Sequence, residues 1–184
     1  MHVCVFLGAN PGKREEYTVA VAALGRALGQ SGCTLVYGGG SAGLMGVLAN
    51  NAHEAGAKVI GVITHELAPI ERSGDGVGTV ITVNTMHERQ AKMHDLCDLY
   101  IACPGGIGTM AELTEVICWC KLDMHSKPIG LLNVCGYYDP LSTFLDHSVV
   151  EGFLPSKTHD LVVKHDDPET LLKHLLSLAS AQEK

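Results

Sequence analysis

Short, continuous apolar runs alternate with helix-length amphipathic segments along this 184-residue chain. Runs such as Val3-Cys4-Val5-Phe6-Leu7 are typical of parallel strands covered on both faces, because a half-exposed strand alternates apolar and polar residues. The pattern predicts strands near residues 2–8, 34–38, 58–63, 79–84, 98–103, 128–133 and 160–164. It predicts helices near residues 14–30, 43–55, 86–97, 109–122, 140–151 and 168–179. This alternation indicates a doubly wound, Rossmann-like α/β fold with a mostly parallel sheet.

Length and composition limit the possible classes of protein. We expect a single domain over residues 1–184, since one domain has ~100–200 residues and no linker or repeat interrupts the chain. A formal net charge of −7 argues against bulk binding of nucleic acid or anionic membranes. No apolar run reaches the ~18–20 residues of a membrane helix, and the first residues lack a secretory signal. Seven cysteines without zinc-ligand spacing predict reduced thiols, no metal site and a cytoplasmic protein.

Two glycine-rich loops follow predicted strands and lead directly into helices. They are Tyr37-Gly38-Gly39-Gly40-Ser41-Ala42-Gly43 and Cys103-Pro104-Gly105-Gly106-Ile107-Gly108-Thr109. Glycines let backbone amides approach a ligand, and a helix N-terminus offers unpaired N–H groups that suit a phosphate. Neither loop has the Lys-Ser/Thr of a nucleotide-hydrolysing P-loop. A phosphate loop is therefore predicted, with tight turns that bind nothing as the alternative. Its candidate residues are Gly39, Gly40, Ser41, Gly43 and Gly105.

Arg89 falls inside the apolar stripe of the helix predicted over residues 86–97. At ~100° per residue, one face of this helix carries the apolar residues Met86, Met93, Leu96 and Cys97. Thr85 and Glu88 have the spacing of a capping box that begins the helix. An inward arginine needs an anion, because an unpaired buried charge is very costly. The sequence leaves two partners open: a substrate anion, or an acid of the next helix in a structural salt bridge.

Glu112 lies near the start of the helix predicted over residues 109–122. That helix is apolar nearly all round, which predicts burial in the core or a contact between subunits. Thr109 and Glu112 have capping-box spacing, so a helix cap is one explanation of Glu112. The other explanation is catalysis, because a carboxylate near a phosphate cradle can stabilise the oxocarbenium-like state of glycosidic cleavage. The residues alone leave a nucleotide and a sugar phosphate open as substrates.

Three motifs follow one another along the chain. They are Gly38-Gly39-Gly40-Ser41-x-Gly43-Leu44-Met45-Gly46, Met86-His87-Glu88-Arg89-x-Ala91-x-Met93 and Pro104-Gly105-Gly106-x-Gly108-Thr109-x-x-Glu112. With further similarity from Cys4 to Tyr138, the chain resembles the LONELY GUY family. Members of that family are cytokinin riboside 5′-monophosphate phosphoribohydrolases, which are often mislabelled as lysine decarboxylases.

The resemblance implies a Rossmann-like homodimer that takes a nucleoside 5′-monophosphate and releases a free purine base and ribose 5-phosphate, without a metal or other cofactor. It makes Arg89 and Glu112 the catalytic pair. The substrate contacts that it implies are Glu71, Arg89, Gln90, Gly106, Ile107, Gly108, Thr109, Met110, Ala111 and Glu112. Two positions depart from the family: Gln90 replaces a usual lysine, which removes a positive charge near the substrate, and Cys118 replaces a common threonine.

Two other functions stay open at this stage. A carrier or sensor would bind a nucleotide or a pterin-type cofactor on the same loops without turnover. Glu112 favours the enzyme, since a pure binder needs the phosphate cradle but no carboxylate beside Arg89. A pyridoxal-phosphate-dependent lysine decarboxylase needs a Schiff-base lysine, and no lysine lies beside either glycine loop. The sequence therefore predicts an N-glycosidase for AMP or an N6-substituted AMP.

Overall fold

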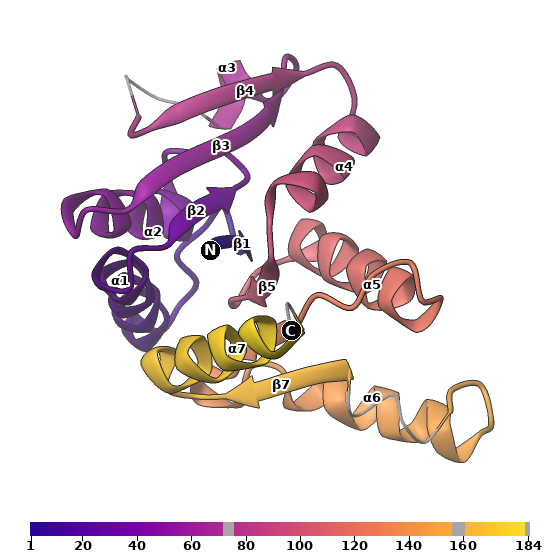
Figure 1. Cartoon of the computed structure of the whole chain (residues 1–184). Helices are drawn as coiled ribbons and strands as arrows, with labels where there is room; N and C mark the ends of the chain where they lie inside the picture. The colour runs from indigo at the N-terminus through magenta and orange to yellow at the C-terminus, as the bar shows by residue number, and fades with distance from the viewer. Residues whose placement is uncertain (72–75, 156–160, 183–184) are drawn as a thin grey trace.

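The strands of the computed structural model, which describes residues 1–71, 76–155 and 161–182, form a single sheet (Figure 1). Their order is β4-β3-β2-β1-β5-β6-β7, and all neighbouring pairs in this described part are parallel. The strands are β1 (His2–Phe6), β2 (Thr34–Tyr37), β3 (Lys58–Thr64), β4 (Thr79–Val83), β5 (Leu99–Ala102), β6 (Ile129–Leu132) and β7 (Val162–His165). The predicted doubly wound α/β fold is thus confirmed, with parallel pairing throughout.

Helices connect the strands and cover both faces of the sheet (Figure 1). They are α1 (Glu15–Gln30), α2 (Gly43–Glu54), α3 (Ala68–Glu71), α4 (Met86–Leu96), α5 (Ile107–Lys121), α6 (Asp139–Val150) and α7 (Pro168–Gln182), with a 3-10 helix η1 (Val134–Gly136). Helices α1, α2 and α7 pack on one face, and α4, α5 and α6 on the other. None of these described helices combines the length and apolar character that crossing a bilayer requires.

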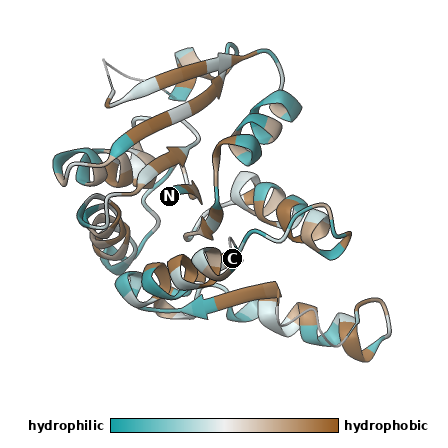
Figure 2. Cartoon of the chain, in the orientation of Figure 1, coloured by the Kyte–Doolittle hydropathy of each residue, from teal (hydrophilic) through white to brown (hydrophobic). Residues whose placement is uncertain are grey.

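The strands are apolar throughout because both of their faces are buried. In β1, Val3 and Val5 pack into the core under α1, α2 and α7, whereas Cys4 and Phe6 pack into the core under α4 and α5. Successive strand residues point to opposite faces, so a strand with a core on each side needs a continuous apolar run. Figure 2 shows this apolar character along the central strands. All seven cysteines are free thiols, as the sequence predicts.

The sheet order places two loops side by side where β1 and β5 are neighbours. From this point the chain winds outward in both directions, toward β2 on one side and toward β6 on the other. Ligand sites in open parallel sheets form at the carboxyl ends of the strands flanking such a switch point. The loop after β1, residues 8–12, touches the loop after β5: the Gly8 N–H donates to the Pro104 carbonyl at 3.1 Å. The fold thus predicts a ligand site between these two loops.

Candidate active site

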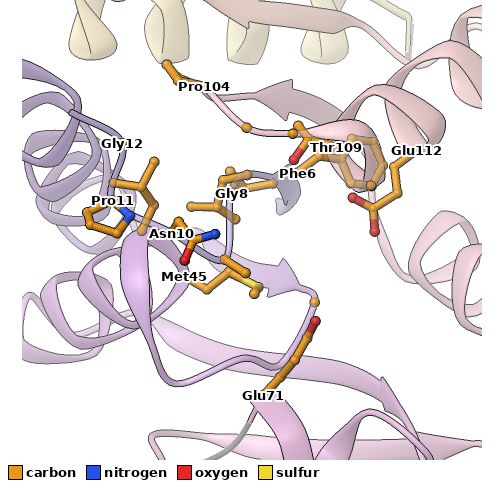
Figure 3. Close-up of a pocket in the computed structure, with 18 of the residues that line it drawn as sticks. Phe6, Gly8, Asn10, Pro11, Gly12, Met45, Glu71, Pro104, Thr109 and Glu112 are labelled. Atoms are coloured by element: carbon orange, nitrogen blue, oxygen red, sulfur yellow. The ribbon is translucent and has the colours of Figure 1, made fainter. Parts of the chain in front are cut away.

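A cavity of about 630 Å³ opens at the carboxyl ends of β1 and β5. Figure 3 shows Asn10, Pro11 and Gly12 of the first loop on one side of it, and Pro104, Thr109 and Glu112 on another. The residues of its wall that bear on function are Gly8, Gly38, Glu71, Arg89, Gly105, Gly106, Gly108, Thr109, Glu112 and Tyr137. The volume lies in the range of about 300–1,000 Å³ that small-molecule sites occupy.

Arg89 is 6% exposed and reaches the cavity from α4. Its Nε donates to the Val62 carbonyl at 2.9 Å, and its Nη2 donates to the Gly38 carbonyl at 3.2 Å. Its Nη1 donates to Oε1 of Glu112 at 2.8 Å. The prediction of an inward arginine is confirmed. The acid of the next helix, which the sequence offers as one possible partner, does pair with it, and the pair borders the cavity instead of lying in the core.

The local sequence explains how α4 and β2 accommodate this arginine. Thr85 Oγ1 accepts from the Glu88 N–H at 3.1 Å, and a Glu88 carboxylate oxygen accepts from the Asn84 N–H at 2.8 Å. The predicted capping box is thus confirmed, and it fixes where α4 begins. At Gly38 an added Cβ would lie 2.2 Å from Arg89 Nη2. Only a glycine at that position leaves room for the guanidinium.

Glu112 lies on the second turn of α5, with its carboxylate directed toward the cavity (Figure 3). Burial raises the pKa of this carboxyl above its ordinary value, the Arg89 guanidinium opposes the rise, and the charge of Glu71 adds to it. The predicted helix cap is wrong for Glu112. Helix α5 begins two residues earlier than expected, with Gly106 as its N-cap and no side-chain capping bond. Thr109 is instead buried inside the helix against Gly105.

Glu71 approaches the cavity from α3, opposite the loop after β5 (Figure 3). Its Oε2 atom is buried and has no hydrogen-bond partner among the described residues. Its backbone carbonyl accepts from the Ser41 N–H at 2.9 Å, which ties α3 to the first glycine loop. A buried carboxylate oxygen without a donor is costly, so this atom is suited to accept a hydrogen bond from a ligand.

The structure separates the residues of the predicted phosphate loop. Gly105 lies on the cavity wall, whereas Gly39, Gly40, Ser41 and Gly43 do not. Gly39 and Gly43 have φ of +79° and +55°, which an ordinary side chain rarely adopts. The first glycine loop thus makes a tight turn that contacts α3 and contributes Gly38 to the wall, and the second loop contributes Gly105 and its neighbours.

The residues that the family resemblance singles out also fall into two groups. Those on the cavity wall are Glu71, Arg89, Gly106, Gly108, Thr109 and Glu112. Those away from it are Gln90, Ile107, Met110 and Ala111. Gln90 is buried, and its side-chain amide donates to the backbone carbonyl of Glu112 at 3.3 Å. The other departure from the family, Cys118, is exposed.

Two parts of the wall have no counterpart in the sequence prediction. The loop of residues 8–12 forms one side of the cavity, and Tyr137 contributes from the segment after η1. Gly8 and Gly12 match no phosphate-binding pattern. Their position directly after the first predicted strand is the one feature of the sequence that could have indicated a place in the cavity wall. That feature becomes informative only when the strand order is known, because the order defines the switch point.

The start of α5 gives the cavity a positive end. Helix α5 begins at Ile107, so the N–H groups of its first turn have no acceptor within the helix. An added Cβ would meet nothing within 4 Å at Gly106 or Gly108, so the backbone there is open to a ligand. Together with the partial positive charge of the helix N-terminus, this arrangement suits a phosphate group.

Among known structures, the fold resembles that of molybdenum-cofactor proteins. The molybdenum cofactor binding protein of Rippkaea orientalis has 22% sequence identity and a TM-score of 0.70, with 96% of both chains covered. The Moco carrier protein of Chlamydomonas reinhardtii has 24% identity and a TM-score of 0.70, with 98% of both chains covered. At these identities the likeness shows the fold alone.

The sequence comparisons go further. Residues 45–175 match a family model described as "possible lysine decarboxylase". The cytokinin riboside 5′-monophosphate phosphoribohydrolase LOG2 of Arabidopsis thaliana is 46% identical over 94% of this chain and 81% of its own. The probable cytokinin riboside 5′-monophosphate phosphoribohydrolase LOGL2 of Oryza sativa subsp. japonica is 46% identical over 99% of this chain and 75% of its own. The chain therefore belongs to the LONELY GUY family of cytokinin riboside 5′-monophosphate phosphoribohydrolases.

Proposed function

We propose that this chain hydrolyses the N-glycosidic bond of AMP or an N6-substituted AMP and releases the free base and ribose 5-phosphate. The buried pair of Arg89 and Glu112 carries the proposal. The pair places the Glu112 carboxyl, whose pKa is raised, in the wall of a nucleotide-sized cavity. The N–H groups at the start of α5, which have no acceptor within the helix, lie beside it. Similarity to the phosphoribohydrolases over almost the whole chain supports it independently.

In this reaction water adds its oxygen to C1′ of the ribose while the bond from C1′ to the base nitrogen breaks. One proton of the water leaves with the base. As that bond weakens, positive charge develops on C1′ and the ring oxygen, and a nearby carboxylate stabilises it. The ionised form of Glu112 would supply this negative charge and accept this proton from the attacking water before the proton passes to the departing base.

Arg89 completes the proposed catalytic pair. It holds Oε1 of Glu112, and among the described residues Oε2 of Glu112 has no hydrogen-bond partner, which leaves that oxygen available to the reacting groups. The bonds of Arg89 to the carbonyls of Val62 and Gly38 fix the guanidinium, so the carboxylate is oriented before the substrate arrives. Such preorganisation removes a reorganisation cost from the reaction.

The remaining substrate contacts follow from the cavity wall. We assign the 5′-phosphate to the N–H groups near Gly106, Gly108 and Thr109, where the helix N-terminus favours an anion. The unpartnered Oε2 of Glu71 supports its role as acceptor for a hydroxyl or N–H group of the nucleotide. Phosphate binding at this point makes the nucleotide a better substrate than the free nucleoside, because the phosphate contacts add binding energy that the nucleoside lacks.

A panel of nucleoside 5′-monophosphates and nucleosides, with the products separated by chromatography, tests the proposal. We expect base and ribose 5-phosphate in equal amounts from AMP or an N6-substituted AMP, and clearly slower release from adenosine. Equal turnover of adenosine and AMP would contradict the assigned role of the phosphate. Binding of AMP without release of any base would favour a carrier or sensor, for which Glu112 is unnecessary.

We also propose that the enzyme is a cytoplasmic homodimer. Large apolar side chains are exposed on α5 and α6 and just beyond their ends: Ile107, Leu122, Met124, Phe144, Val150 and Phe153. Burying such surface between two copies stabilises a dimer by about 25 cal/mol per Å² of apolar area. Seven free thiols support a reducing compartment such as the cytoplasm.

A further inference from the structure

Two adjacent tyrosines hold the loop between β5 and α5 by its carbonyl groups. The hydroxyl of Tyr138 donates to the Cys103 carbonyl at 2.6 Å, and the hydroxyl of Tyr137 donates to the Gly105 carbonyl. Tyr138 is fully buried, whereas Tyr137 is exposed and lies on the cavity wall. Neither residue belongs to a glycine motif, and neither has a part in the chemistry proposed above.

The other carbonyls of this loop are occupied as well. The Pro104 carbonyl accepts from the Gly8 N–H at 3.1 Å, and the Gly106 carbonyl accepts from the Met110 N–H at 3.0 Å. Each carbonyl of residues 103–106 therefore has a donor within the protein. A carbonyl oxygen carries partial negative charge, so a loop with every carbonyl engaged repels a bound anion less and presents its N–H groups instead.

Two aromatic rings contact the ring of Tyr137. The Tyr137 ring is in edge contact with Tyr17 on one side, with centroids 5.7 Å apart, and with Tyr138 on another, at 5.2 Å. The loop that it holds is confined, because a Cβ on Gly105 would lie 2.1 Å from Thr109 Oγ1 and 2.9 Å from the Gly8 nitrogen. The bond from Tyr137 to Gly105 thus joins two parts of the wall that lie far apart in sequence.

We propose that Tyr137 is a positioning residue for the substrate phosphate, and this inference rests on the proposed function. Its hydroxyl keeps the Gly105 carbonyl occupied and thereby sets the orientation of the peptide groups that lead into α5. Tyr138 does the same at Cys103, one step deeper in the fold. Tyr137 itself needs no contact with the phosphate for this role, and it takes no part in bond cleavage.

The variant Tyr137→Phe tests the proposal, because it keeps the ring and removes only the hydroxyl. We expect the KM for AMP to rise about tenfold, the effect of losing one hydrogen bond that supports binding. We expect kcat to stay within about twofold, since the phosphate is held equally in the ground state and the transition state. The affinity for ribose 5-phosphate, measured by calorimetric titration, should fall by the same factor as the KM rises.

Tyr100→Phe is the matched control. Tyr100 lies on β5, the strand that leads into the same loop, and its hydroxyl is bonded to Nδ1 of His94 away from the cavity. This variant also loses a hydroxyl hydrogen bond, so its melting temperature should fall while the KM for AMP and the affinity for ribose 5-phosphate stay unchanged. An equal rise of KM in both variants would show a general loss of structure and overturn the proposal.

Binding and turnover measurements each provide an outcome that would overturn the proposal. An unchanged affinity of Tyr137→Phe for ribose 5-phosphate overturns the positioning role, and so does a wild-type protein that fails to bind ribose 5-phosphate. A fall in kcat at unchanged KM overturns it too. If the wild-type protein releases no base from any nucleotide, the proposed hydrolysis fails, while the calorimetric comparison still decides the role of Tyr137.

Discussion

Nη1 of Arg89 and Oε1 of Glu112 lie 2.8 Å apart, and the two side chains are only 8% and 14% exposed. The pair joins α4 to α5 at the wall of the cavity. In a buried pair each charge depends on the other, because a single charge left in the interior has no solvent to stabilise it. In the proposed mechanism stability and activity therefore depend on the same two side chains, and variants can separate the two effects.

Glu112→Gln should remove activity and keep the fold. Glutamine preserves the shape of the side chain and an oxygen for Arg89, but it lacks the negative charge that the proposed transition state needs. We expect the variant to bind AMP while turnover falls about 100-fold or more. Melting, AMP binding and base release on one preparation check this. Glu115→Gln, one turn further along α5 and off the cavity wall, is the control and should keep most of its turnover.

Arg89→Met should destabilise the protein more than the substitution of any single exposed residue. It leaves Glu112 buried without its partner and removes the donor from the Val62 carbonyl. We expect the free energy of unfolding to fall by about 3–5 kcal/mol. In a Glu112→Gln background the same replacement should cost less, because no buried charge is stranded. Urea unfolding of the four proteins measures the coupling, and equal losses in both backgrounds would mean that there is none.

The pH dependence of activity should report the raised pKa of Glu112. The ionised carboxylate is the active form in the proposed mechanism, so kcat/KM for AMP should fall as the pH drops through a value above the ordinary glutamate pKa of about 4.3. The negative charge of Glu71 contributes to the rise. Glu71→Gln should therefore shift the acid limb of the profile to lower pH, whatever it does to KM. An acid limb at the same pH in both proteins would contradict this explanation.

His125 should make the fold less stable in acid. Its Nε2 donates to the Val116 carbonyl at 2.9 Å and its Nδ1 accepts from the Lys127 N–H at 3.1 Å, which requires the neutral ring. Burial, with a smaller contribution from the Lys127 charge, lowers the pKa of His125, while the bond to Val116 opposes this. The unfolded state therefore binds more protons as the pH falls below about 6.5, and stability is lost there.

The variant His125→Gln lacks the contribution that protonation of His125 makes to the loss of stability in acid. Melting temperatures measured from neutral to mildly acidic pH should fall less steeply for the variant than for the wild-type protein. The neighbouring His94, whose pKa burial also lowers, supplies the slope that remains. Parallel curves for the two proteins would show that His125 does not contribute to the acid sensitivity.

The proposed dimer can be tested by light scattering at micromolar protein. We expect twice the chain mass for the wild-type protein, and a shift toward one chain mass when Leu122→Asp and Phe144→Asp are combined. Both side chains are exposed in the single chain, and both lie on the side of the sheet that α5 and α6 cover. Val19→Asp alters an equally exposed apolar residue on α1, across the sheet, and should leave the dimer intact. A wild-type monomer would disprove the assembly.

Two Thr-x-x-Glu patterns of identical spacing show what the sequence can and cannot predict. Thr85 and Glu88 form the box at the start of α4, whereas Thr109 and Glu112 form none, because α5 begins at Ile107. Glu112 is bonded to Arg89, which lies 23 residues away in sequence. Local spacing predicts a cap in both places, and only the tertiary partner distinguishes them.

Each strand of the sheet can be predicted from its own local sequence, whereas the order of the strands in the sheet cannot. Continuous apolar runs locate each strand, but neighbours such as β1 and β5 are far apart in the chain. The position of the loop at Gly8 in the cavity wall therefore could not be predicted from the sequence. Nor could the contact of the first glycine loop with α3, in which the Ser41 N–H donates to the Glu71 carbonyl, because no sequence motif indicates it.

The three bonds of Arg89 also determine when the chain acquires its site. They reach Glu112, Val62 and Gly38 across 23, 27 and 51 residues of sequence. Contacts of such separation form only after the intervening chain has been ordered, since closing each loop costs entropy that only the finished packing offsets. A chain in which residues 38–112 are not yet packed together thus cannot orient the carboxylate. Nucleotides therefore meet the proposed catalytic pair only after this part of the chain has folded.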